Sequence, residues 1–239
     1  MNSYFGTNYK AYTKEALDVA IISGSKDWSK IKSTESINKD SKSFYYQKED
    51  IKRSNVLTHK FYNIIPVNDS EGKAVGLIGR PYDAITDGLP INGSLFHSYA
   101  VAWYNFMHTM KKMNPEVPLL DTLDQYKEFA IRYISIAPYE KHWIITDEYN
   151  TRVMAMYSYE IKNNSLILYN VYVNPAFRNQ GLLKEMLRHA ENECINHQCD
   201  RVFFTVYKKN IRAQTCYEKC GFTKTNTNYI EVLKSEEAQ

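Results

Sequence analysis

The residues best suited to do chemistry lie where a short apolar strand runs into a helix, in Val171-Tyr-Val-Asn-Pro-Ala-Phe-Arg-Asn-Gln-Gly-Leu-Leu183. A strand, a turn and a helix in this order gather free backbone N–H groups and the positive end of the helix dipole, which together favour a phosphate. Gly181 has no Cβ, so the backbone can approach a ligand closely, and Arg178 adds a fixed positive charge. An ordinary strand-to-helix turn has the same order of elements, so this segment alone leaves both interpretations open.

A second group of candidate residues follows one predicted strand later, in Asn210-Ile-Arg-Ala-Gln-Thr-Cys-Tyr217-Glu-Lys-Cys-Gly-Phe222. Asn210 stands just before a predicted helix, where its side chain would make a good N-cap. Tyr217 carries a phenol that can protonate or hydrogen-bond a departing group. Its position on the apolar stripe of the same helix also suits core packing, so two roles are open for it.

The two groups together read V-x-P-x-x-R-x-x-G and then N-x-x-A-x-x-x-Y-x-x-x-G-F, which resembles the GNAT superfamily of N-acetyltransferases over residues 166–222. The resemblance implies acetyl-CoA as co-substrate and direct transfer of its acetyl group to an amine. It implies that the backbone of Val171 and Val173 holds the pantetheine and polarises the thioester carbonyl, and that Asn210 also reaches the coenzyme. It places the pyrophosphate on the backbone N–H groups of Arg178, Asn179, Gln180, Gly181, Leu182 and Leu183. Leu183 is a departure, because the family usually has Gly or Ala there.

Acetyl transfer to an alkyl amine needs a proton acceptor, because such amines are mostly protonated at neutral pH. Some relatives carry a glutamate at the position of Ile167, so their base has no counterpart here. Strand alternation puts Tyr169 on the same face, and Glu160 and Asp147 lie on neighbouring predicted strands. We therefore take Tyr169 and Glu160, with Tyr217, as the candidate catalytic residues. Each of the carboxylates would equally suit a solvated strand position.

An alternative function is a catalytically inactive module that binds acyl-CoA or a protein partner. The missing carboxylate at Ile167 and the bulky Leu183 are the residues that favour it. The acceptor site of such enzymes is built largely by the first two helices and their connection, here Met110–Asp121. The sequence leaves open whether the acceptor is a small molecule or a macromolecule, whether nucleic acid is bound, and whether the chain forms a homodimer.

The elements that must position these residues follow from the apolar spacing. We predict a hairpin from FYNIIPVN and KAVGLIGR around Asp69–Gly72, and a loop over 80–94. The further predicted elements are helices at 95–113 and from Asp121 or Thr122 to 137, strands at 142–147, 153–161 and 166–173, a helix from 182, a strand at 201–207, a helix at 211–219 and a strand near 228–233. This order predicts an α/β fold with a central mixed, mostly antiparallel sheet flanked by helices, as the resemblance implies. Short turns predict antiparallel middle strands, and the later strand–helix–strand unit predicts a parallel pair.

Residues 1–60 are polar and have no sustained apolar period, so we predict an N-terminal extension there and an acetyltransferase domain at 61–239. Basic residues in the extension alternate with aromatic ones, which would suit a nucleic acid or an acidic partner, although a solvated surface has the same composition. A net charge of +3 on 239 residues argues for neither alone.

No apolar run approaches the ~18 residues that span a bilayer, and the start MNSYFGTNYK lacks the apolar core of a signal peptide. We therefore expect a cytoplasmic protein. The four cysteines lie between Cys194 and Cys220 at spacings unlike those of zinc sites, so we expect buried, reduced thiols and no metal.

Overall fold

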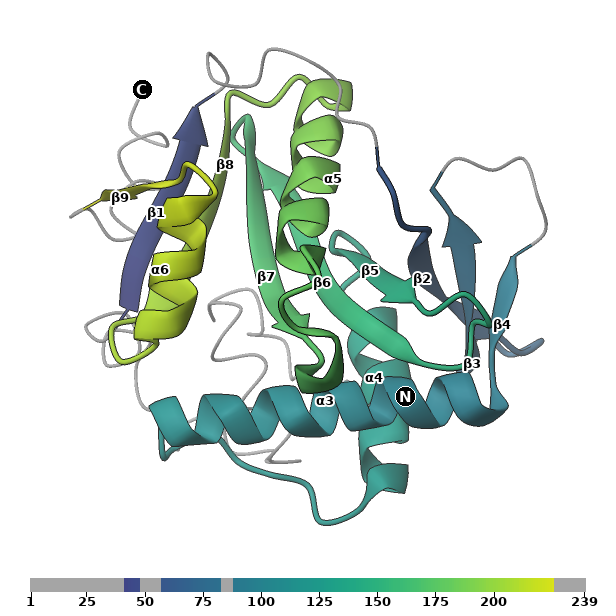
Figure 1. Ribbon diagram of the computed structural model, residues 1–239. Coiled ribbons are helices and arrows are strands. Elements are labelled where there is room, and N and C mark those ends of the chain that lie inside the picture. Colours follow the sequence, from purple (N-terminus) through teal and green to yellow (C-terminus); the bar gives the residue numbers. More distant parts are fainter. Residues whose placement is uncertain (1–40, 48–56, 83–87, 226–239) are drawn as a thin grey trace.

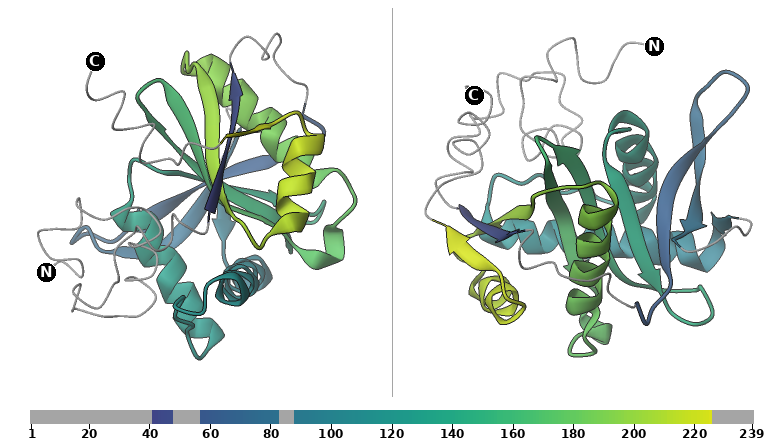
Figure 2. Two further views of the ribbon diagram at one scale, coloured as in Figure 1. Left: turned by 90° about the vertical axis from the view of Figure 1, so that its left-hand side faces the viewer. Right: turned by 90° about the horizontal axis from the view of Figure 1, so that it is seen from above.

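The computed structural model describes residues 41–47, 57–82 and 88–225. Over these ranges it forms one nine-stranded sheet with helices on both faces (Figures 1 and 2). The strands are β1 (Ser41–Gln47), β2 (Phe61–Asn68), β3 (Ala74–Pro81), β4 (Leu89–Ile91), β5 (Lys141–Thr146), β6 (Val153–Lys162), β7 (Ser165–Val173), β8 (Arg201–Tyr207) and β9 (Thr223–Thr225). Across the sheet they lie in the order β4-β3-β2-β5-β6-β7-β8-β1-β9. The β7–β8 pair is parallel and the other described pairs are antiparallel, which confirms the predicted mixed, mostly antiparallel sheet.

Helices cover the two faces of the sheet in pairs. They are α3 (Gly93–Met113), α4 (Leu123–Ile136), α5 (Leu182–Asn196) and α6 (Ile211–Lys219), with a short 3-10 turn η4 (Pro175–Phe177) before α5. Figure 2 shows α5 and α6 on one side of the sheet and α4 on the other, while Figure 1 shows α3 lying across the end of the sheet where η4 sits. The predicted helix positions are confirmed. Thr122 caps α4 in a reciprocal capping box with Gln125.

Two hydrophobic cores lie on opposite faces of the sheet because strand side chains alternate. On the α3/α4 side, the Trp103 ring meets Phe129 and Tyr133 at centroid distances of 5.1 and 5.3 Å. On the α5/α6 side, Leu182 and Met186 pack with residues of the central strands. The α3/α4 core also ties to the sheet through the Ser98 hydroxyl, which accepts a hydrogen bond from Val153 N–H at 2.9 Å.

The β2–β3 hairpin is confirmed, and Asp69 shapes its turn by accepting hydrogen bonds from the N–H groups of Glu71 and Lys73. The predicted loop at 80–94 is wrong in part, since Leu89–Ile91 pairs with β3 as strand β4. The strand predicted near 228–233 lies outside the described residues, where the last described strand is Thr223–Thr225.

A strand from the predicted N-terminal extension lies inside the sheet. Ser41–Gln47 pairs along its length with β8, and Ser43 to Tyr45 also pair with β9. No strand was predicted in these seven residues of the extension. The low hydrophobicity of the surrounding sequence concealed them, because strand pairing is made by backbone groups that composition does not report. The domain boundary at residue 60 stays a prediction, with β1 of the sheet lying before it.

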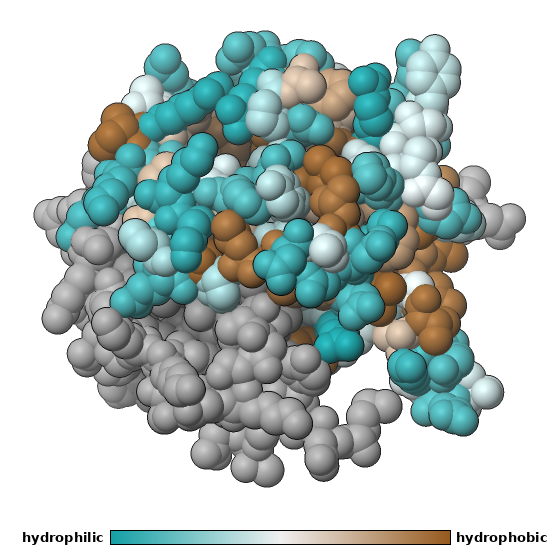
Figure 3. Space-filling view, turned by 90° about the horizontal axis from the view of Figure 1, so that it is seen from below, coloured by the Kyte–Doolittle hydropathy of each residue, from teal (hydrophilic) through white to brown (hydrophobic). Residues whose placement is uncertain are grey.

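The four cysteines are free, with Cys194 and Cys199 buried and Cys216 and Cys220 half-buried. Among the described residues, no helix is long and apolar enough to cross a membrane, and no three His, Cys, Asp or Glu side chains are placed to hold a metal ion. Figure 3 views the molecule from the α3 end, where apolar and hydrophilic residues alternate in small patches over the described surface that is visible.

A buried histidine sits between α5 and the sheet. His189 is fully buried, stacks on Phe61 at 4.5 Å and lies against Tyr82 and Trp143 at 4.2 and 4.4 Å. Its Nδ1 contacts the Tyr157 hydroxyl. Burial among these rings lowers the pKa of His189 to about 3, so the ring is neutral in the folded protein.

We expect Tyr45→Pro to lower the melting temperature more than Tyr45→Thr does. Tyr45 pairs with both β8 and β9, so a proline there removes an N–H that faces a partner strand. Leaving a ladder carbonyl unpaired costs about 1–3 kcal/mol. Thermal unfolding of the two variants isolates the backbone effect, since both lose the tyrosine ring. Equal melting temperatures would show that β1 contributes nothing to stability.

We expect stability to fall with acidification through His189. Between the ordinary histidine pKa of about 6.5 and the folded value of about 3, the unfolded chain binds a proton that the native chain does not. The free energy of unfolding should therefore drop by up to ~1.4 kcal/mol per pH unit over that window. His189→Asn keeps an acceptor for Tyr157 but does not titrate, so its denaturant-derived stability should lose this part of the slope. Parallel slopes in both proteins would refute the assignment.

Candidate active site

The strands β7 and β8 start side by side and then separate. Their pairing covers Ser165 to Ile167 against Arg201 to Phe203, although β7 continues to Val173 and β8 to Tyr207. Figure 1 shows the gap between them widening toward η4. Within the described chain, the last residues of β7 thus have no partner strand on this side. Backbone N–H and C=O groups that lack a ladder partner require another one, and an extended ligand can supply it.

An extra residue in β7 sits at the start of this gap. Met156 pairs with Tyr172 and Ser158 with Tyr169, so Asn170 and Val171 together oppose the single residue Tyr157. This is a β-bulge, and Asn170 adopts a left-handed conformation with φ of +53°. Because of the bulge, the side chains beyond it change faces. Val171 and Val173 pack on the α5 side, whereas Tyr172 joins the α3/α4 core.

The turn after β7 is fixed by local hydrogen bonds. Asn174 accepts a bond from Ala176 N–H at 3.1 Å, and Pro175 opens η4. The Arg178 Nε donates to the Val173 carbonyl at 3.3 Å, which keeps its guanidinium beside the end of β7. Burial raises the pKa of Tyr172 there, and Asn105 and the nearby Arg178 charge oppose that rise. Arg178 therefore places a positive charge at the mouth of the gap.

The start of α5 presents its backbone to open space. Gly181 is the N-cap residue, with φ of +80° and no side-chain cap, and Asn179 is also left-handed at +64°. A Cβ placed on Gly181 would meet no atom within 4 Å. Leu182 is buried and Leu183 packs against the same core. The side chain of Leu183, where the family usually has Gly or Ala, therefore points into the protein interior. The N–H groups of the first turn are thus available to an anion.

The one acidic residue in the first turn of α5 is neutralised. Glu185 is buried, accepts a bond from Thr58 N–H at 2.8 Å and pairs with Arg188 at 2.9 Å. Burial alone would raise the pKa of Glu185, but the bonds from Thr58, Arg188 and His59 outweigh it and lower the pKa. Because Arg188 balances this carboxylate, the helix N-terminus keeps its attraction for negative charge.

The second predicted group lies across the gap on α6 (Figure 1). Asn210 accepts a bond from Ala213 N–H at 3.2 Å, so its predicted N-cap role is confirmed. Tyr217 is buried, with its ring 4.2 Å from Phe204 of β8 and 6.3 Å from Phe222. Burial raises the pKa of Tyr217, and Cys216 and Cys220 add to the shift, so the hydroxyl stays protonated at neutral pH.

The two remaining candidates meet on the opposite face of the sheet. The Tyr169 hydroxyl donates to a Glu160 carboxylate oxygen, which makes them a hydrogen-bonded pair on β7 and β6. Asp147 does not join them. It accepts bonds from Thr151 and Arg152 in the β5–β6 turn, and although burial would raise its pKa, these bonds lower it.

A buried polar network beside this pair was missed by sequence reasoning. The Tyr133 hydroxyl donates to Glu140 at 3.2 Å, His142 Nδ1 lies 3.6 Å from the same carboxylate, and the Asn170 amide reaches Tyr133, Glu140 and Ser158. Glu140 comes just before β5 and His142 is the second residue of that strand, so their two-residue spacing was a usable signal that they share a face. No sequence pattern indicated that Tyr133 of α4 would contact Glu140.

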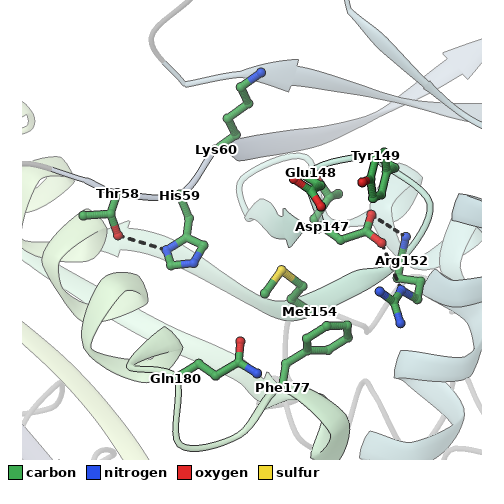
Figure 4. A pocket seen from close by; sticks show the side chains of 11 residues that line it. Thr58, His59, Lys60, Asp147, Glu148, Tyr149, Arg152, Met154, Phe177 and Gln180 are labelled. Carbon is green, nitrogen blue, oxygen red and sulfur yellow. Dashed lines mark hydrogen bonds and ion pairs between the residues drawn. The ribbon is translucent and has the colours of Figure 1, made fainter.

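A cavity of about 510 Å³ lies between the segment before β2, the β5–β6 turn and the loop that precedes α5 (Figure 4). Met154 and Phe177 line it together with Arg152, whose guanidinium sits 5.0 Å from the Phe177 ring and is held by Asp147. Gln180 turns its side chain toward this cavity. The other lining residues are Thr58, His59, Lys60, Thr146, Glu148 and Tyr149.

Comparison with known proteins identifies the class. The family model described as "Acetyltransferase (GNAT) family" matches residues 102–222, just over half of the chain, and the chain therefore belongs to this family. The matched range contains the gap, the α5 loop and α6, so the resemblance read from the two motifs is confirmed. None of the curated proteins compared with the chain matches it.

Several solved structures match the chain at low sequence identity and low TM-score. An acetyltransferase of the GNAT family from Staphylococcus aureus Mu50 is 18% identical, with a TM-score of 0.41, covering 68% of this chain and 84% of its own. Glucosamine-6-phosphate N-acetyltransferase from Arabidopsis thaliana is 16% identical, with a TM-score of 0.40, covering 55% and 89%. A predicted acetyltransferase from Clostridium acetobutylicum, with acetyl-CoA, is 16% identical, with a TM-score of 0.39, covering 56% and 88%.

Proposed function

We propose that the chain transfers the acetyl group of acetyl-CoA directly to the amine of an acceptor. The observation that carries the proposal is the combination of an open β7–β8 gap with an uncapped, left-handed Gly181 at the start of α5. An extended thiol arm fits a gap between two strands, and a pyrophosphate fits a helix N-terminus. Membership of an acetyltransferase family supports the same assignment.

The residues present suit the coenzyme in three places. The backbone of Arg178 to Leu183 would hold the pyrophosphate, aided by the Arg178 charge. The backbone of Val171 and Val173 would bind the pantetheine and place a donor at the thioester oxygen. Such a preplaced donor meets the charge that develops on that oxygen during attack. Asn210 uses its side chain on Ala213, so it would contribute to the coenzyme through its remaining groups.

The reaction is a displacement at a carbonyl carbon. When bound, acetyl-CoA supplies an acetyl group on a thioester that an amine can attack. The amine nitrogen bonds to the carbonyl carbon, the carbon–sulfur bond breaks, the nitrogen loses a proton and the thiolate gains one. The products are an amide and a free thiol.

Tyr217 would serve the departing sulfur as a hydrogen-bond donor. Its raised pKa makes it a weaker acid than a thiol, whose pKa is about 8.5, so net proton donation to the thiolate would be uphill. A hydrogen bond to the developing thiolate has no such cost. The buried phenol therefore stabilises charge, and the final proton arrives from the surroundings.

Tyr169 and Glu160 are the proposed route for the proton that the amine loses. Their hydrogen bond lets a phenol oxygen accept a proton while its own passes to the carboxylate. The acceptor would enter on the α3/α4 side, where the connection between those helices runs from Asn114 to Thr122. Glu116 and Asp121 in that connection would suit a cationic amine.

A binding assay followed by a turnover assay tests the function. We expect CoA and acetyl-CoA to raise the melting temperature, and thiol release to follow when an amine panel is added. Stabilisation without thiol release from any amine would favour the inactive binding module. A melting temperature unchanged by either ligand would overturn both functions.

We expect Gly181→Ala to weaken CoA binding about 10- to 100-fold by calorimetry, because losing charge-assisted bonds to phosphate costs about 1.5–3 kcal/mol. Gly72→Ala is the matched control, since Gly72 has φ of +78° against +80° for Gly181 and equally open surroundings. Both variants should lose a similar ~1–2 kcal/mol of stability from the left-handed backbone. An equal change in CoA affinity for the two would exclude Gly181 from the site.

We expect Tyr217→Phe to reduce the rate of acetyl transfer by about 10- to 150-fold, the value of one hydrogen bond to a charged group. The phenyl ring still packs on Phe204 and Phe222, so CoA affinity and melting temperature should change little. The measurement is single-turnover acetyl transfer on an amine identified by the panel. A purely structural tyrosine would instead show lower stability and an unchanged rate.

A further inference from the structure

The bulge in β7 is held by a side-chain clamp that reaches three other elements. The Asn170 Nδ2 lies within hydrogen-bond distance of three acceptors, which are Ser158 Oγ of β6 at 3.0 Å, the Tyr133 hydroxyl of α4 at 3.1 Å and Glu140 Oε1, just before β5, at 3.3 Å. The two protons of the amide are shared among them. All three acceptor residues are buried. One residue thus joins the bulge to the neighbouring strand β6, to the residue before β5 and to helix α4.

The chemistry of the partners dictates the orientation of the Asn170 amide. The Glu140 carboxylate only accepts, and the Tyr133 proton is already directed at that carboxylate. The group that faces them must therefore be the NH₂ end of the amide. An aspartate would put a second carboxylate against Glu140, and an alanine would leave the buried acceptors short of a donor.

The left-handed backbone at Asn170 matters because of where it lies. Asn170 lies three residues beyond Ile167, the last β7 residue that pairs with β8, and directly before Val171. Val171 has no register partner on β6, so its backbone is outside the regular ladder. The conformation of Asn170 consequently sets the direction in which the Val171 N–H points.

We propose that Asn170 is a positioning residue of the transfer site, whose clamp on Ser158, Tyr133 and Glu140 aims the Val171 backbone into the gap between β7 and β8. This inference rests on the proposed function. The clamp acts through Val171 and does not touch the reacting atoms. It also makes α4, on the acceptor side, part of the support for the acyl site, since Tyr133 belongs to that helix.

The test compares Asn170→Gly with Asn164→Gly. Glycine tolerates the left-handed conformation, so Asn170→Gly removes the clamp without forcing a clash. Asn164 lies in the β6–β7 turn with φ of +52°, close to the +53° of Asn170, and takes no part in the clamp, so it controls for added backbone freedom. Valine isotope labelling follows the Val171 amide by NMR in each protein with CoA and with acetyl-CoA.

We expect acetyl-CoA to shift the Val171 amide signal more than CoA does in the wild-type protein and in Asn164→Gly. In Asn170→Gly this acetyl-dependent shift should be lost while CoA affinity stays within about twofold of the control. The rate of transfer at saturating substrate should fall about 10- to 100-fold, because a small displacement of a positioned group costs that much. If Asn170 were merely structural, Asn170→Gly would lower CoA affinity and stability together. It would not remove the acetyl-dependent shift while CoA affinity is retained.

The outcomes separate the inference from the function beneath it. CoA binding with an unchanged acetyl-dependent Val171 shift in Asn170→Gly would overturn the inference alone. An acetyl-dependent shift absent from the wild-type protein, despite CoA binding, would also overturn it. No CoA binding to the wild-type protein would overturn the proposed function, and the inference with it.

Discussion

One extra residue in β7 decides which side of the sheet each part of the site faces. Side chains alternate along a strand, so strict pairing beyond Leu168 would direct Val171 and Val173 to the α3/α4 side. The bulge at Asn170 reverses this order and gives those two positions to the α5 side, where the Gly181 turn and Tyr217 also lie. It also sends Tyr172 into the other core. The two faces of the site are therefore consequences of a single insertion.

The bulge is stable because the buried polar groups around it form hydrogen bonds with one another. Glu140 is a buried carboxylate, and a charge in that position is tolerated only with close donors. Tyr133 and Asn170 supply them, and His142 lies beside the same oxygen. The same logic operates at the start of α5, where Thr58 and Arg188 satisfy Glu185. In both places a buried acid is compensated within the protein and leaves the adjacent backbone open.

The sequence predicted elements well where side chains carry the information. The helices α3 to α6 and strands β5 to β8 appear where apolar periodicity placed them, and the N-caps Thr122 and Asn210 do what their residue types suggest. Strand β1 was missed because its place in the sheet is a matter of backbone pairing with distant residues. The bulge was missed because an extra residue leaves no trace in composition. The Tyr133–Glu140 contact joins helix α4 to the residue before β5, and no spacing rule predicts a contact of this kind.

The position of β1 also constrains how the molecule is assembled in time. Ser43 pairs with Thr205 on one side and with Thr225 on the other. Strand β1 therefore cannot take its place until the distant strands β8 and β9 are present. Pairings this distant in sequence carry a high loop-closure cost and slow folding. During synthesis from the N-terminus, β1 leaves the ribosome long before either neighbour exists. Until it docks, β8 presents an open edge to other chains, so the interval before closure is when the nascent protein is most exposed to mispairing.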